Sequence, residues 1–311
     1  MNTNSNVYTV IYTTVIVVVV AALLAFVSQS LKDRQDANEK AETISQMLTA
    51  AQYGSKAELD KLSNTAKLNK YAEEIEKAFV IDLEGNVVKE LEGIEVYSPK
   101  ALKRQNYNIK GGANKSGEPE LPVFIFKNGR TVVPIYGAGL WGPIWGYISF
   151  EGQSAVIGGA YFDHESETAG LGAKIKDDPS FQAQFNGEVA DFSNANVFDI
   201  VKGGAPKDGN GKSVMDNKID AISGATMTSQ GLDAAIDTWL AAYAKYFLAN
   251  AAPAQKACCG QHEGCEGHEA CEGDEACGQH EACEEGHEAC GQQQPKEGCQ
   301  GHCEHHNMME E

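Results

Sequence analysis

A long apolar stretch near the start of the chain constrains its fold more than any other feature. No charged side chain occurs from Met1 to Leu31, and Val7–Val27 is apolar apart from tyrosine and threonine residues. As a helix, these 21 residues span about 31 Å, which matches the ~30 Å hydrocarbon core of a membrane. The sequence therefore predicts a short N-terminal end at residues 1–6 and one transmembrane helix at residues 7–28.

The alternative interpretation of this stretch is a signal peptide that is cleaved. It fits less well, because nothing basic precedes the stretch and because such peptides have a shorter apolar region of roughly 7–15 residues. Lys32, Arg34 and Lys40 follow the stretch, and basic residues beside a span favour the cytoplasmic side of the membrane. Taken alone, the charges therefore favour a cytoplasmic position for the rest of the chain.

Charge and cysteine are distributed unevenly along the 311 residues. The formal net charge is −19; the residues from Ala251 onward contain 14 Asp/Glu and 2 Lys, or −12, which leaves −7 for the body. The body has no basic stripe, so nucleic acid is not expected as a partner. It contains none of the nine cysteines and only one histidine, His164. Redox chemistry in the body would therefore need an organic cofactor rather than cysteine-ligated iron–sulfur clusters.

The last part of the chain, residues 251–311, is a low-complexity region rich in Cys, His and Glu. Its cysteines recur every six residues from Cys259 to Cys283, in a unit close to Gly-x-His-Glu-Ala-Cys. The unit has almost no large apolar side chain, so this tail is predicted to be disordered. Thiol and imidazole groups at short spacing bind zinc, copper or nickel. The sequence does not decide which metal the tail binds, or whether metal binding serves the function of the chain. Candidate ligands include Cys259, His262, Cys265 and His268.

The body between the apolar stretch and the tail predicts a mixture of strands and helices. Lys32–Leu62 has the composition of a charged, alanine-rich helix followed by a second short one. Apolar runs bounded by turns predict strands at Ala78–Leu83, Val87–Leu91, Leu121–Phe126, Arg130–Tyr136, Ile144–Glu151 and Ala155–Phe162. Phe181–Phe185 is expected to be helical, and apolar residues from Leu232 to Phe247 predict a closing helix. This order favours an α+β domain over residues 32–250.

The segment Asp220–Ser229 is the strongest candidate for chemistry. It is a turn of small and hydroxyl-bearing residues directly before the predicted closing helix. Free N–H groups at the start of a helix bind phosphate, and Gly224 leaves room for a ligand near the backbone. Thr228 or Ser229 is expected to cap the helix. An ordinary capped turn has the same residue types, so composition alone does not separate the two interpretations.

Within this segment, Ser223-Gly224-Ala225-Thr226 with Thr228 after it resembles the flavinylation motif of the FMN-binding domain family. In that family a flavin transferase joins the phosphate of FMN to the last threonine of the tetrapeptide. The resemblance therefore implies covalent FMN on Thr226, with the other four residues beside it. A phosphoester leaves the flavin ring unmodified, so the ring keeps its one- and two-electron chemistry.

Two further segments extend the resemblance. His164–Gly172 is similar to the family's His-x-Glu-Thr-Pro-Gly-Leu-Gly segment with one residue inserted, and Ala169 replaces the proline. Gly137–Gly146 resembles the Gly-x-Gly-Leu-Trp segment of the C subunit in the sodium-translocating NADH:quinone reductases. The cofactor-binding residues that these segments imply are Glu167, Thr168, Gly170, Leu171, Gly172, Gly139, Leu140 and Trp141. Trp141 would shield the flavin or fill the core, and His164 is interpreted as a hydrogen-bonded structural group rather than a proton relay.

The resemblance to the C-subunit family also implies a function and a location. Such a chain relays electrons through FMN in a bacterial Na⁺-translocating NADH:quinone reductase, whose quinone is ubiquinone or menaquinone. Its partners would be the other subunits, the flavin transferase and membrane lipid. Its domain would lie in the periplasm, on the outer side of the inner membrane. This implication of the resemblance outweighs the charge pattern, which favours the cytoplasmic side.

The residues also limit what this chain would do within such a complex. No Gly-x-Gly-x-x-Gly segment follows a strand, so NADH oxidation and catalytic residues are expected in other subunits. The apolar stretch has no carboxylate for sodium. The alternatives are the G subunit of an Rnf-type electron transport complex, which shares the flavin motif, and a membrane-tethered metal-binding protein whose working part is the tail.

Overall fold

The computed structural model describes residues 6–209, 213 and 217–250 of the chain. The predicted tail, with its candidate metal ligands, lies outside these described residues. Within them, no group of three or more His, Cys, Asp or Glu side chains is placed to hold a metal ion.

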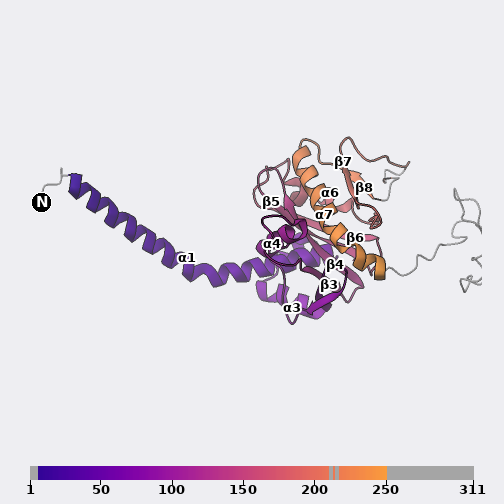
Figure 1. Cartoon of the computed structure of the whole chain (residues 1–311), viewed down its shortest axis with the longest axis horizontal. Helices are drawn as coiled ribbons and strands as arrows, with labels where there is room; N and C mark the ends of the chain where they lie inside the picture. The colour runs from indigo at the N-terminus through magenta and orange to yellow at the C-terminus, as the bar shows by residue number, and fades with distance from the viewer. Residues whose placement is uncertain (1–5, 210–212, 214–216, 251–311) are drawn as a thin grey trace, which may run out of the picture. The chain divides into compact units, whose positions relative to one another are not determined.

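The chain starts with one long helix, α1 (Asn6–Ala50), which contains the predicted transmembrane segment. Of the described helices, it alone is long and apolar enough to cross a membrane, and its apolar window is not buried by the rest of the chain. The charged helix predicted from Lys32 is a continuation of this same helix (Figure 1). Most side chains from Ala41 to Ala50 are buried against the domain. One continuous helix therefore joins the apolar segment to the folded domain.

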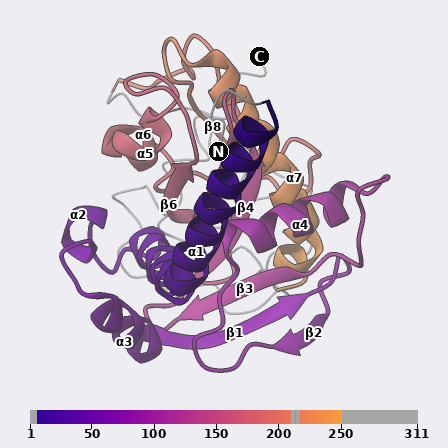
Figure 2. The same ribbon diagram turned by 90° about the vertical axis from the view of Figure 1, so that its left-hand side faces the viewer.

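The domain is built on a six-stranded antiparallel sheet in the order β2-β1-β3-β4-β5-β6. Its strands are β1 (Ile75–Ile81), β2 (Val87–Glu90), β3 (Leu121–Phe126), β4 (Arg130–Ala138), β5 (Pro143–Glu151) and β6 (Ile157–His164). Each predicted strand is found within a few residues of its expected bounds, and β1, β2 and β3 lie side by side in Figure 2. In the longest hairpin, Arg130 of β4 faces Glu151 of β5, and Ala138 faces Pro143.

Helices cover both faces of the sheet. They are α2 (Lys56–Leu59), α3 (Asn64–Glu74), α4 (Pro99–Lys110), α5 (Lys174–Asp177), α6 (Pro179–Ala183) and α7 (Thr226–Asn250). One core packs α7 against Val133 and Ile148, and the other packs the end of α1 and Tyr71 of α3 against Val132 and Tyr147. Successive side chains of a strand point to opposite faces, so Val132 and Val133 enter different cores. The expected α+β fold is confirmed.

Several elements go beyond the sequence-based expectations, namely α3, α4, α5 and a parallel pair, β7 (Asp199–Val201) and β8 (Lys218–Asp220). The start of α4 has clear signals, because the Ser98 hydroxyl accepts a bond from the third helical N–H and Pro99 takes the first helical position. Hydrophobic periodicity misses α4 because its buried residues other than Leu102 are the polar Gln105, Asn106 and Asn108.

Two glycines allow α7 to approach β4 closely. A Cβ atom at Gly231 would lie 2.2 Å from the carbonyl oxygen of Ala138, and one at Gly137 would lie 2.5 Å from Ala235 Cβ. Close-packed interiors cannot absorb such overlaps, so a side chain at either glycine would move the helix. This contact fixes the first turns of α7 beside the end of β4, where the Gly139–Trp141 segment begins.

Candidate functional site

The three segments predicted to bind FMN meet at the carboxylate of Glu167. Glu167 Oε1 accepts a hydrogen bond of 2.9 Å from the backbone N–H of Trp141. Its Oε2 accepts one of 2.7 Å from the hydroxyl of Thr228, in the first turn of α7. Glu167 and Thr228 are both buried. The two bonds therefore tie together the loop after β4, the loop after β6 and the start of α7.

Two glycines provide the space that this carboxylate occupies. A Cβ atom at Gly139 would lie 2.3 Å from Glu167 Oε1, and one at Gly172 would lie 2.3 Å from Oε2 and 2.6 Å from Thr228 Oγ1. A side chain at either position would displace the carboxylate and break its hydrogen bonds. The structure thus gives these glycines a packing role that the sequence analysis does not assign to them.

The loop that carries Glu167 has its own internal support. The Glu167 N–H donates a bond of 3.1 Å to His164 Nδ1, so His164 is a hydrogen-bonded part of this loop. Further along, the Thr168 carbonyl accepts a bond of 3.1 Å from the Leu171 N–H, and Gly170 has a left-handed φ of 74°. Thr168 and Gly170 therefore shape the turn after Glu167.

Thr226 is the first residue of α7 and follows a tight turn. In that turn Gly224 has a left-handed φ of 79°, and the Ala225 N–H donates a bond of 3.1 Å to the Ile222 carbonyl. Ser223 is exposed in the turn, and Thr226 is partly exposed. The first N–H groups of a helix have no intrahelical acceptor and form the positive end of its dipole. A phosphate on Thr226 would lie at this end of α7.

The expectation that Thr228 or Ser229 caps α7 is wrong, because the helix already begins at Thr226. The Ser229 hydroxyl instead accepts a bond of 3.1 Å from the Ile222 N–H, which closes the turn before the helix. The Thr228 hydroxyl is used by Glu167. Both buried hydroxyls therefore hold the framework, whereas the hydroxyls of Ser223 and Thr226 lie nearer to solvent.

The segments that meet at the start of α7 carry four exposed large apolar side chains, which together are called the apolar surface. They are Leu140, Trp141, Leu171 and Met227. Trp141 is 67% exposed, so it does not fill the core. A Cβ atom at Gly224 would lie 3.0 Å from Leu171 Cδ2, which places Leu171 against the turn before Thr226. Met227, 58% exposed, belongs to this surface by its position, although the sequence analysis does not single it out.

Two aspartates of α7 anchor the segment that leads to Thr226. Asp233 Oδ1 accepts a bond of 2.6 Å from the Ile200 N–H, and Asp237 Oδ1 accepts one of 3.1 Å from the Phe198 N–H. These bonds hold β7, which pairs with β8. Because β8 runs directly into the Ser223–Thr226 turn, α7 helps to position the segment that precedes it.

The burial of Asp233 makes the free energy of unfolding depend on pH. Burial raises the pKa of Asp233 from 3.8 to about 6. The folded chain therefore holds this proton more tightly than the unfolded chain. The protonated carboxyl group thus stabilises the folded chain at low pH, and this contribution to the free energy of unfolding is lost as pH rises from about 4 to about 6. We expect Asp233→Asn, which stays neutral, to match the unchanged chain below pH about 4 and to exceed its stability above pH about 6. Urea unfolding at both ends of this pH interval measures the difference in the free energy of unfolding between the two chains. A difference that does not change with pH would refute the raised pKa of Asp233.

The residues around Thr226 fit an FMN group. A partly exposed hydroxyl is available for a phosphoester, and the N-terminus of a 25-residue helix suits the phosphate. The neighbouring apolar side chains suit a flat aromatic ring, since small-molecule sites combine an apolar surface with a few placed polar groups.

Comparison with known proteins agrees with this geometry. The family described as FMN-binding domain matches residues 139–241, which include all three segments around Glu167. The C subunit of the Na(+)-translocating NADH-quinone reductase from Vibrio anguillarum is 32% identical over 123 residues, which are 38% of this chain and 46% of that protein. This match thus spans about half the length of the relative. The corresponding protein of Vibrio campbellii is 28% identical over 237 residues, 71% of this chain and 85% of that protein.

Solved structures give the same result. The crystal structure of the Na(+)-translocating NADH-quinone reductase C subunit from Parabacteroides distasonis is 29% identical, covers 70% of this chain and 96% of that chain, and superposes with a TM-score of 0.53. NqrC of Shewanella oneidensis, 24% identical with a TM-score of 0.52 over 68% of this chain and 98% of that chain, has the same fold. Residues 139–241 thus match the FMN-binding domain family, and the chain is similar in sequence and fold to C subunits of Na(+)-translocating NADH-quinone reductases.

Proposed function

We propose that the chain carries FMN covalently, through a phosphoester between the FMN phosphate and the Thr226 hydroxyl. The observation that carries the proposal is the place of Thr226 at the start of α7, in a turn fixed by Gly224 and Ser229. The hydroxyl is therefore presented at the positive end of a helix, beside exposed apolar side chains.

Each part of the site has a proposed role. Glu167, with Gly139 and Gly172, holds the Trp141 loop and Thr228 in place. The turn before α7 would contact the phosphate through Ser223, Gly224 and Ala225. The ring would lie against the apolar surface of Leu140, Trp141, Leu171 and Met227, with Thr168 and Gly170 shaping its edge.

We propose that this flavoprotein is an electron relay within a Na⁺-translocating NADH-quinone reductase. FMN supplies uptake and release of one or two electrons when it is bound, and the chain binds and orients it. The apolar part of α1 would anchor the domain in the membrane beside the other subunits, which would oxidise NADH, reduce quinone and move sodium. The relatives that align with most of their length support this assignment.

Expression with and without a flavin transferase tests the attachment. With the transferase, the denatured chain is expected to run on a gel as a band that fluoresces under ultraviolet light, because a phosphoester survives unfolding. Without the transferase, the same folded chain should give a dark band. A bound flavin that is released on denaturation in both cases would show that FMN is held without a covalent bond.

We also propose that residues 32–250 lie in the periplasm. A variant that ends at Asn250 has no cysteine, so a single new one can report its location. We expect Ala57→Cys, at an exposed residue of α2, to react with a membrane-impermeant thiol reagent in intact cells whose outer membrane is permeable to it. The matched variant Asn4→Cys, before the apolar stretch, should be protected. The reverse pattern of labelling would support the orientation that the charges favour.

A further inference from the structure

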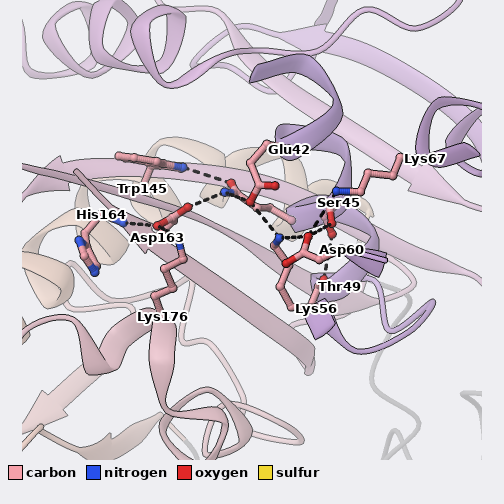
Figure 3. Close-up of polar contacts among 11 residues, drawn as sticks. Glu42, Ser45, Thr49, Lys56, Asp60, Lys67, Trp145, Asp163, His164 and Lys176 are labelled. Carbon is pink, nitrogen blue, oxygen red and sulfur yellow. Dashed lines mark hydrogen bonds and ion pairs between the residues drawn. The ribbon is translucent and has the colours of Figure 1, made fainter. Parts of the chain in front are cut away.

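A buried polar cluster joins the end of α1 to β5 and β6, next to the candidate flavin site. Gln46 of α1 is buried; its Nε2 donates a bond of 2.7 Å to Asp163 Oδ2, and its Oε1 accepts one of 3.1 Å from Trp145 Nε1. Trp145 and Asp163 are direct neighbours across the β5–β6 pair. Figure 3 shows both side chains pointing toward the same stretch of α1. A single glutamine of the anchoring helix therefore contacts both strands.

Asp163 is the centre of this cluster. It is 4% exposed, and besides Gln46 it has two donors on its Oδ1: the His164 N–H at 2.8 Å and Lys176 Nζ of α5 at 2.8 Å. A buried carboxylate is costly unless it is paired and hydrogen-bonded. Removal of any one donor therefore affects how the others are held, so α1, β6 and α5 are coupled at this point.

The cluster continues to the flavin site through His164. The backbone N–H of His164 donates to Asp163, while its ring Nδ1 accepts from the Glu167 N–H at 3.1 Å. Glu167 in turn holds the Trp141 N–H and the Thr228 hydroxyl. Hydrogen bonds therefore connect α1, through Asp163 and His164, to the loop and helix that surround Thr226.

We propose that Asp163, held by Gln46 and Lys176, is a positioning residue that fixes the Glu167 loop relative to α1. The inference rests on the proposed function only in so far as this loop is part of the FMN site. Its consequence is that the anchoring helix and the flavin loop move as one unit. The flavin would then keep a constant orientation toward the membrane and the other subunits.

Hydrogen exchange of the full chain in detergent, without flavin, tests this coupling. Gln46→Met keeps the volume of the side chain but removes its hydrogen bonds to Glu42, Asp163 and Trp145. Asp163→Asn removes the charge that pairs with Lys176. Both variants are expected to raise the exchange rates of the Glu167 and Trp141 amides by about tenfold, since local opening follows the loss of such bonds. The control is Thr49→Val, because among the described residues the Thr49 hydroxyl bonds only within α1, to the Ser45 carbonyl.

The same variants are then loaded with FMN, and the visible circular dichroism of the flavin is recorded. A changed flavin band in Gln46→Met, with the band of Thr49→Val unchanged, would support the coupling. The inference is overturned if the Glu167 and Trp141 amides of Gln46→Met exchange as in the unchanged chain, or if all amides of the domain accelerate equally. A chain that takes up no FMN would refute the proposed function, while the exchange experiment would still decide on the coupling.

Discussion

Replacement of Thr226 by alanine is expected to remove all chain-bound flavin that survives denaturation. The proposed ester needs the Thr226 hydroxyl, and the neighbouring buried hydroxyls of Thr228 and Ser229 are committed to Glu167 and Ile222. The fold should be kept, because Thr226 is partly exposed and alanine is well tolerated in helices. In-gel fluorescence of the chain co-expressed with a flavin transferase measures the loss.

The matched control for this variant is Thr238→Ala, in the same helix. Within the part of the chain that the structure describes, the Thr238 hydroxyl bonds only to the Ala234 carbonyl of α7, so its removal should leave the fluorescence unchanged. Thr226→Ser keeps a hydroxyl and is expected to retain some flavin. A covalent flavin that persists in Thr226→Ala would rule out the assigned attachment residue.

Replacement of Glu167 by alanine has the second largest expected effect. It leaves the Trp141 N–H and the buried Thr228 hydroxyl without their acceptor, and such losses cost about 2–4 kcal/mol in the free energy of unfolding. The loop after β4 and the start of α7 would also lose their common support. We therefore expect lower urea stability and a several-fold lower yield of flavin on the chain.

Glu165→Ala is the control for Glu167→Ala. Glu165 lies in the same loop and is exposed, and its backbone bond to the Pro143 carbonyl does not depend on its side chain. Glu165→Ala removes the same negative charge as Glu167→Ala. Equal effects of the two variants on stability and flavin yield would therefore show that the charge matters, and not the hydrogen bonds of Glu167. Unchanged stability and flavin yield in Glu167→Ala would show that the carboxylate does not organise the site.

The sheet could be predicted from the sequence because its strands are short apolar runs bounded by turns. Leu121–Phe126 has its expected bounds, since the run between its turns is fully apolar apart from one proline. α4 could not be found in this way, because its buried face is largely polar. β7 and β8 have three residues each, which is too short to show the alternation of apolar and polar residues in a strand. Both strands also depend on contacts with residues that are distant in the sequence.

The parts of the candidate site could also be predicted, but not their assembly. The motif indicates Thr226 and Glu167, yet the bond between Glu167 and Thr228 joins residues 61 positions apart in the sequence. The local preference of serine for helix caps gives a wrong start for α7, because Ser229 closes the preceding turn instead. Gln46 has no sequence signal at all; its role depends on Trp145 and Asp163, which only the fold brings to α1.

The central claim is that FMN is joined to Thr226, and the mass of the proteolytic peptide that contains this residue tests it most directly. In the chain expressed with a flavin transferase, the peptide is predicted to be heavier by one FMN less one water, and fragmentation should place the added mass on Thr226. An unmodified Thr226 in a chain that carries covalent flavin, with the added mass on Ser223 or Thr228, would contradict the claim.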